Sequence, residues 1–205
     1  MKKLIVISTS VLLCVSLIVS VYFLYGFGSS KSNVTVVNTP AQKAATVPDQ
    51  FAVKKVDIKR PSGKNLALNQ KVTTDGITDV YTPERAVDGK TAETSYWEGK
   101  PDMPNTFTVT LDQPQEVGVV LVALNPDPLW SKRTQKFSIL ESEDGTNFTE
   151  AAGSDEYTFD PDTGNYVTIP LSKVKKVKAV KLMFTANSGS AGAQMAELEL
   201  YAKNS

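Results

Sequence analysis

Between residues 62 and 203 the apolar side chains fall in short runs separated by turn residues, and this pattern limits the fold more than any other feature. Residues 107–111 alternate apolar with polar, as in a strand with one buried face, and residues 117–124 are almost continuously apolar, as in a strand buried on both faces. Asp144-Gly145 and residues 160–165 have the composition of turns. We therefore predict an all-β sandwich or jelly roll without amphipathic helices. The remaining predicted strands are 136–142, 147–151, 157–159, 166–171, 177–184 and 193–201.

The N-terminus predicts a membrane segment. Lys2 and Lys3 precede the uncharged run 4–24, which is long enough to cross a bilayer as a helix. We assign residues 1–25 to a signal-anchor, with the lysines in the cytoplasm and the C-terminal domain outside the cell membrane. A cleaved signal peptide is the alternative, because small residues at 26–30 suit cleavage, and the protein would then be secreted.

The segment after the apolar run predicts a flexible linker followed by one domain. Residues 26–60 are rich in Ser, Lys, Asn, Thr, Gln and Ala, and prolines interrupt any periodicity. We assign residues 26–60 to the linker and 61–205 to the β-sandwich domain.

The composition excludes several classes of chemistry. The chain has no His and a single Cys, Cys14, so His-based catalysis, His- or Cys-ligated zinc and an internal disulfide are all excluded. Its 22 basic and 22 acidic residues give zero net charge, which argues against nucleic acid as a partner. For the lysines between 173 and 181, which alternate with valines, we favour a solvated strand edge over a patch for anionic polymers.

Several motifs resemble discoidin domains, also known as coagulation factor V/VIII type C domains. The opening motifs are NLALNQ at 65–70, RAVDG at 85–89 and TSYWEG at 94–99, and AELELY at 196–201 is similar to the end of the family's domain. WSKRTQ at 130–135 and FTANSG at 184–189 resemble a subgroup found beside bacterial α-1,3-glucanases. The resemblance implies a galactose-binding-like jelly roll, similar to family 32 carbohydrate-binding modules, in which loops at one end bind the ligand.

The same resemblance implies a structural Ca²⁺ where the first turn meets the last strand. Carboxylate, hydroxyl and carbonyl oxygens are the ligands that hard cations prefer. Asp88, Thr94 and Glu197 would supply side chains, and Arg85, Lys90 and Ala196 would supply backbone oxygens. A lone Asp-Gly turn is otherwise an ordinary structural feature.

The two tryptophans differ in their surroundings. Trp97 is expected to pack near the metal loop, whereas Trp130 lies in a polar, proline-broken loop and either packs in the core or stacks on a sugar ring. Glu98 stands where galactose-binding relatives carry a polar ligand residue, often His, so galactose specificity is in doubt. The candidate carbohydrate contacts are Tyr81, Glu98, Asn125, Trp130, Arg133 and Asn187.

The leading interpretation is a non-enzymatic, extracytoplasmic carbohydrate-binding module, tethered to the membrane by its N-terminal helix and binding a polysaccharide or cell-surface glycan. The alternative is an adhesion or protein-interaction domain, since discoidin loops also bind proteins and, in animals, phospholipids. An enzyme built on paired carboxylates such as Glu98 and Asp127 is a third class, disfavoured because the family uses this fold for binding.

Overall fold

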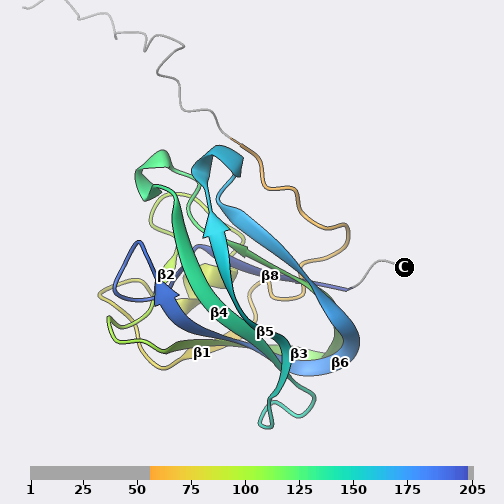
Figure 1. Cartoon of the computed structure of the whole chain (residues 1–205). Helices are drawn as coiled ribbons and strands as arrows, with labels where there is room; N and C mark the ends of the chain where they lie inside the picture. The colour runs from red at the N-terminus through yellow and green to blue at the C-terminus, as the bar shows by residue number, and fades with distance from the viewer. Residues whose placement is uncertain (1–55, 203–205) are drawn as a thin grey trace, which may run out of the picture. The chain divides into compact units, whose positions relative to one another are not determined.

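The computed structural model describes residues 56–202, which form an antiparallel β-sandwich (Figure 1). The predicted all-β class is confirmed, and within this range the helices are short 3-10 turns. One sheet has the order β1-β3-β6-β4-β5, with β8 also paired to β3, and β2 pairs with β7 in a small second sheet. The strands are β1 (Lys71–Thr74), β2 (Trp97–Glu98), β3 (Asn105–Ala123), β4 (Arg133–Ser142), β5 (Thr149–Phe159), β6 (Tyr166–Asn187), β7 (Gln194–Met195) and β8 (Glu197–Tyr201).

Three of the observed strands each join two predicted segments. The predicted strands 107–111 and 117–124 are both parts of β3, 147–151 and 157–159 are joined in β5, and 166–171 and 177–184 are joined in β6. In β3 the ladder to β6 shifts register between Thr110 and Gln115, around Pro114, which cannot donate a backbone hydrogen bond. The strands β1 and β2 are too short to show an apolar pattern, and the sequence analysis missed both.

The long strands β3 and β6 connect the two layers of the sandwich. The first half of β3 lies between β1 and β6, and its second half lies between β6 and β8. The ribbon of β6 curls sharply from one layer into the other (Figure 1). This fold-over explains why one hydrogen-bonded sheet can bury its own inner face.

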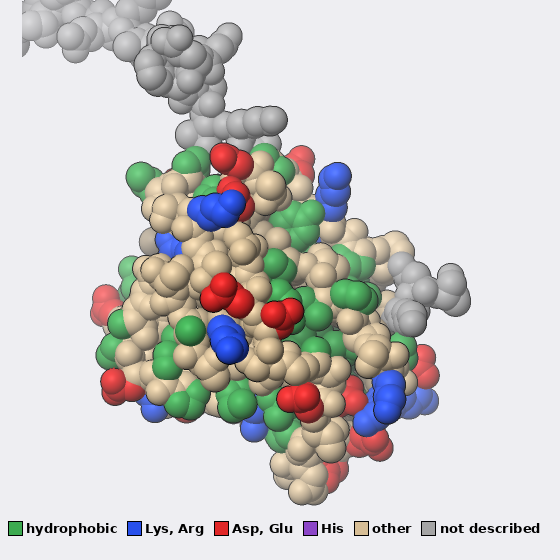
Figure 2. All heavy atoms as spheres, in the orientation of Figure 1, with side chains coloured by type: hydrophobic (Ala, Val, Ile, Leu, Met, Phe, Trp, Pro, Cys, Tyr) green, Lys and Arg blue, Asp and Glu red, His purple; other side chains and the backbone are tan. Residues whose placement is uncertain are grey.

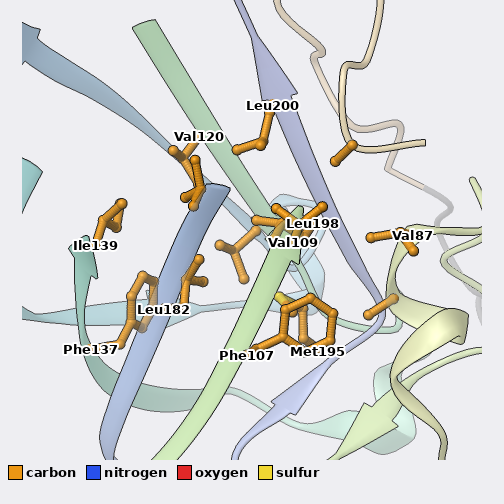
Figure 3. Close-up of a cluster of buried hydrophobic side chains, with 14 of the residues drawn as sticks. Val87, Phe107, Val109, Val120, Phe137, Ile139, Leu182, Met195, Leu198 and Leu200 are labelled. Atoms are coloured by element: carbon orange, nitrogen blue, oxygen red, sulfur yellow. The ribbon is translucent and has the colours of Figure 1, made fainter. Parts of the chain in front are cut away.

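The core fills the space between the layers. Phe107 and Val109 of β3 are fully buried, whereas Thr106 and Thr108 between them are partly exposed, as the alternation in the sequence predicts. Figure 3 shows these side chains meeting Leu182 from β6 and Leu198 from β8. Acidic and basic side chains are interspersed among apolar ones on the face of the molecule drawn in Figure 2.

The described end of the predicted linker packs on the outer face of the sandwich. Ile58 contacts a small buried cluster of Leu121, Ala123 and Tyr201. Arg60 Nε forms an ion pair with Glu199 Oε1 at 2.8 Å. Residues 58 and 60 therefore contribute to the folded domain.

Three 3-10 helices shape the loops: η2 (Pro83–Val87), η3 (Pro128–Trp130) and η4 (Pro161–Thr163). Asp160 caps η4 by accepting from Asp162 N, so residues 160–164 are a structural turn. Among residues 56–202, no helix is long and apolar enough to span a membrane. The predicted signal-anchor, Cys14 and most of the predicted linker lie outside the described residues.

Candidate binding site

Three aromatic rings from separate loops form one partly exposed surface, which we call the aromatic platform: Tyr81, Tyr96 and Trp130. Tyr81 and Tyr96 are stacked with ring centroids 4.2 Å apart. Tyr96 meets Trp130 edge to face at 4.7 Å. All three side chains are half-buried, and Trp130 also packs against the main core cluster. Trp130 therefore packs against the core and also contributes exposed aromatic surface.

Glu98 lies beside the platform and is held in place by two side chains. Its backbone N–H donates to Tyr81 O at 3.3 Å, which places residue 98 next to the platform. Ser190 Oγ donates to Glu98 Oε1 at 2.6 Å, and Gln194 Nε2 donates to Glu98 Oε2 at 3.2 Å. The carboxylate is half-buried, so it remains accessible to a ligand.

Arg133 lies behind this group and is largely used within the protein. It is buried, with its guanidinium 5.0 Å from the Trp130 ring centre. Its Nη1 donates to Gln194 Oε1 at 2.6 Å, Nε donates to Ser131 O at 3.4 Å, and Nη2 donates to Trp130 O. Arg133 thus fixes the Trp130 loop and Gln194, and burial lowers the pKa of its guanidinium while Glu98 partly opposes that shift.

Two other predicted ligand residues have structural partners. Asn125 is buried; its Nδ2 donates to Glu93 O at 2.7 Å and its Oδ1 accepts from Asp127 N at 2.9 Å. Asn187 closes its own loop by donating to Gly192 O at 2.7 Å and accepting from Gly189 N at 2.9 Å. The structure therefore brings Tyr81, Glu98 and Trp130 together, and uses Asn125 and Asn187 to shape the loops around them.

The sequence analysis missed Tyr96, although a signal was present. Successive side chains in a strand point to opposite faces. Trp97 is fully buried against Phe107 and Phe184, as expected for a packing residue. Its neighbours Tyr96 and Glu98 must therefore face outward, and both lie at the platform.

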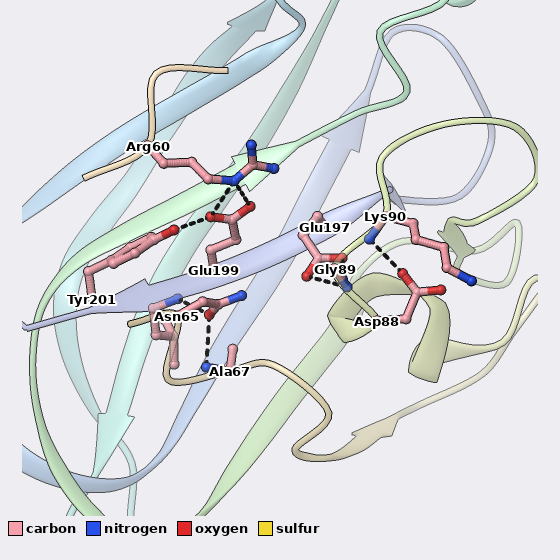
Figure 4. A network of polar contacts seen from close by, with 10 residues as sticks. Arg60, Asn65, Ala67, Asp88, Gly89, Lys90, Glu197, Glu199 and Tyr201 are labelled. Atoms are coloured by element: carbon pink, nitrogen blue, oxygen red, sulfur yellow. Dashed lines mark hydrogen bonds and ion pairs between the residues drawn. The ribbon is translucent and has the colours of Figure 1, made fainter. Parts of the chain in front are cut away.

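Three of the predicted calcium residues, Asp88, Lys90 and Glu197, lie at the turn that follows η2 (Figure 4). Glu197 is fully buried, and both of its oxygens accept from Gly89 N, at 3.1 and 3.2 Å. Asp88 Oδ1 accepts from Lys90 N at 2.8 Å and Oδ2 accepts from Ser95 Oγ at 2.5 Å. Burial is the main cause that raises the pKa of Glu197 to about 8, and the negative charges of Glu199 and Asp88 add to it.

The same region is hollowed toward solvent and partly suits a hard cation. A cavity of about 640 Å³ is lined by Arg85, Asp88, Lys90, Thr94 and Ser95, together with residues 91–93. Among residues 56–202, no three carboxylates converge as a metal site would need, so hydroxyl and backbone oxygens would have to complete the shell. Arg85 Nη1 donates to Thr94 O at 2.7 Å. A divalent cation would nevertheless offset the charge of the buried Glu197 carboxylate.

Comparisons with known proteins agree with the motifs in the sequence. A model of the F5/8 type C domain family matches residues 69–198, well over half of the chain. A search of curated proteins gave no match.

Solved structures share the fold. A chitosan-binding module of a chitosanase/glucanase from Paenibacillus sp. IK-5 is 24% identical, with a TM-score of 0.52, covering 68% of this chain and 100% of its own. CpGH89CBM32-5 from Clostridium perfringens, in complex with GalNAc-β-1,3-galactose, is 24% identical with a TM-score of 0.55 and the same two coverages. A Streptococcus pneumoniae fucose-binding module is 21% identical, with a TM-score of 0.52, covering 68% of this chain and 96% of its own. The family model matches from Asn69 to Leu198, and these residues form a β-sandwich. The chain therefore belongs to the F5/8 type C, or discoidin, domain family.

Proposed function

We propose that this protein is a non-enzymatic carbohydrate-binding module that binds a polysaccharide or cell-surface glycan through the aromatic platform. The observation that carries the proposal is the convergence of Tyr81, Tyr96 and Trp130 beside the accessible carboxylate of Glu98. Aromatic rings stack on the apolar faces of sugars, and a few fixed polar groups orient the hydroxyls. The similar structures named for chitosan, GalNAc-β-1,3-galactose and fucose support the same class of ligand.

The carboxylates near the platform support binding rather than catalysis. Asp127 accepts from Leu129 N at 2.8 Å and caps η3. Glu98 is held by Ser190 and Gln194, so each member of the pair considered as catalytic has a structural partner.

The proposal also includes the localisation of the protein and a bound Ca²⁺. An uncleaved segment 4–24 would tether the domain outside the cell membrane, whereas cleavage would release it. A structural Ca²⁺ would be bound by Asp88, Thr94 and Glu197, with backbone oxygens of Arg85, Lys90 and Ala196. It would hold the turn after η2 against β8 and neutralise the buried carboxylate.

Protein or membrane adhesion is the second candidate. Leu129 is 90% exposed and Val80 is 55% exposed, and each is the direct neighbour of a platform residue. Exposed apolar side chains of this kind often mark interaction surfaces. An adhesion domain would depend on Leu129 and Val80, whereas a carbohydrate module would depend on the rings.

The test compares Tyr81→Ala and Trp130→Ala with the matched control Leu129→Ala on a glycan array and by calorimetry with the ligands found. We expect each ring variant to lose at least tenfold in sugar affinity, because a few central aromatics dominate such sites. Leu129→Ala should bind normally. Melting temperatures are measured on the same samples, because a fully buried tryptophan would cost about 3–5 kcal/mol on truncation and the half-buried Trp130 should cost less. Sugar binding that survives both ring variants contradicts the proposal.

A further inference from the structure

Glu98 is the acidic group that a ligand on the aromatic platform would meet. Its carboxylate lies close enough to Tyr96 for its charge to help raise the pKa of that phenol, after the larger effects of burial and of the Tyr81 hydroxyl. Each carboxylate oxygen accepts one hydrogen bond, from Ser190 or from Gln194. A carboxylate offers about four acceptor positions, so roughly two remain for a ligand.

The charge of Glu98 is not neutralised by a direct ion pair. In residues 56–202 the ion pairs join Arg60 to Glu199, Lys100 to Asp75, Lys132 to Asp160 and Lys175 to Glu141, and none includes Glu98. Glu98 is oriented by a hydroxyl and an amide, which are neutral donors. Its negative charge therefore remains available to a positively charged ligand group.

Arg133, the nearby cation, is buried beside the site and bonded to other residues of the protein. Three of its five N–H donors are used by Trp130 O, Ser131 O and Gln194 Oε1. The loop at Gly189 closes over it, since a Cβ added there would lie 2.7 Å from the Arg133 side chain. Arg133 is thus a positioning residue that holds Gln194 against Glu98, and its fork is not presented to solvent for a ligand carboxylate.

The segment that supplies Tyr81, Tyr96 and Glu98 is acidic, whereas residues 125–133, which supply Trp130, contain one acidic and two basic residues. Residues 75–104 contain seven acidic and three basic residues, although the whole chain has no net charge. Of those basic residues, Arg85 donates to Thr94 O and Lys100 pairs with Asp75. A surface with an excess of negative charge attracts cations and repels anions over roughly one Debye length, about 8–10 Å in ordinary salt.

We propose that the aromatic platform selects glycans whose sugars carry free amino groups, with Glu98 accepting the ammonium, and that it discriminates against uronic acids. The inference rests on the proposed carbohydrate function and names the ligand class of that same site. A protonated amino sugar can stack one ring face on the platform while its ammonium donates to the free positions of Glu98. A uronate would place its carboxylate against Glu98, and the neighbouring cation, Arg133, is buried.

The experiment measures calorimetric affinities of the full chain at pH 6, in a polyoxyethylene detergent that contains no sugar. Three tetrasaccharides serve as probes: β-1,4-glucosamine, its N-acetylated form and α-1,4-galacturonate. We expect the free-amine form to bind at least tenfold more tightly than the N-acetylated form, and the galacturonate to bind most weakly. Raising NaCl from 50 to 500 mM should reduce the preference for the amine, because exposed charges are screened by salt.

Glu98→Gln keeps the shape of the side chain and removes its charge. Its amide oxygen can still accept from Gln194 Nε2, and its amide nitrogen can donate to Ser190 Oγ, so one of the two hydrogen bonds reverses direction. It should lower affinity for the free-amine form at least fivefold and change affinity for the N-acetylated form less than twofold. Glu84→Gln is the matched control, because Glu84 is an exposed carboxylate on η2 in the same acidic segment, and it should preserve the preference.

The outcomes separate this inference from the proposed function. Equal binding of the free-amine and N-acetylated forms, or tighter binding of galacturonate, overturns the inference while the carbohydrate function stands. An equal loss of preference in Glu84→Gln and Glu98→Gln also overturns it, since the loop charge as a whole would then be responsible. No binding of any glycan on an array, with Tyr81→Ala behaving like the parent, contradicts the function itself.

Discussion

At the scale of single residues, the buried carboxylates are the features with the largest energetic consequences. Glu197, Glu199 and Glu141 are each at most 4% exposed. A buried charge is tolerated only with compensation from hydrogen bonds, counter-ions or a metal. Glu199 and Glu141 are each paired with a cation, Arg60 and Lys175, whereas Glu197 accepts from Gly89 N and has a raised pKa. All three can be tested by substitution.

Glu197 should make the metal-free protein less stable as pH rises. Its pKa is about 8 in the folded chain and 4.5 as a model value, so between these pH values the unfolded state releases its proton first. Deprotonation then favours unfolding, and stability should fall by up to about 1.4 kcal/mol per pH unit from pH 5 to pH 8. Chemical denaturation in excess chelator measures the slope.

Calcium should reverse this loss if the proposed site exists, because the ion binds the deprotonated carboxylate of the folded state. Millimolar Ca²⁺ should raise the melting temperature at pH 8, and Glu197→Gln should remove both the pH slope and the calcium response. Glu93→Gln, an exposed residue of the same cavity, serves as the control. Identical melting curves in chelator and in Ca²⁺ would rule out the metal site.

Lys175 balances the negative charge of Glu141. Substituting Lys175 should therefore lower the stability of the fold more than substituting its neighbours on β6. Its Nζ lies 3.0 Å from Glu141 Oε1, while Glu141 Oε2 is buried with no hydrogen-bond partner among residues 56–202. Lys175→Met should lower the free energy of unfolding, because it leaves the buried Glu141 carboxylate without its cation. Lys176→Met, at an exposed position one residue on, should cost less than 0.5 kcal/mol in the same denaturation assay. Equal effects would show that the ion pair contributes nothing.

At the scale of elements, the segment before the predicted domain boundary packs across β8 and β3. We call this segment, residues 58–60, the strap. Arg60 pairs with Glu199, which also accepts from the Tyr201 hydroxyl (Figure 4). Ile58 covers the adjacent apolar cluster. The linker composition gives no sign of this contact, because Glu199 lies 139 residues beyond Arg60 in the sequence.

Arg60→Ala should destabilise the domain by about 1–3 kcal/mol, because Glu199 would remain buried without its counter-ion. Lys59→Ala is the control, since its side chain is exposed. Thermal unfolding followed by near-ultraviolet circular dichroism compares the two variants. If both melt at the parent temperature, the strap does not stabilise the fold.

At the scale of the whole molecule, the sequence predicts a tethered domain. The run 4–24 would expose a full helix of apolar surface if it left the bilayer. The protein should therefore stay in the membrane fraction through an alkaline carbonate wash, detected with an antibody against the β-sandwich. Recovery from the medium of a mature chain beginning near Ser29 would instead establish cleavage and secretion.

Much of the fold could be predicted from local patterns. Alternation in 107–111 and the apolar run at 117–124 identified segments of β3, because the pleat puts every second side chain on one face. The pattern could not show that the two segments form one strand, because continuity past Pro114 depends on pairing with β6 rather than on neighbouring residues.

The all-β class, the family, the burial of Trp97 and the exclusion of His and Cys chemistry follow from the amino-acid sequence alone. Which loops meet depends on the folded structure. Tyr81, Tyr96 and Trp130 come from three loops whose paths no local pattern encodes. The structure also shows which polar groups a ligand could reach. Asn125 and Arg133 have the chemistry of ligand contacts but are buried, whereas Glu98 is half-buried and keeps about two of its acceptor positions. A residue's type fixes its capacity for hydrogen bonds, and its neighbours in space decide how much is left for a ligand.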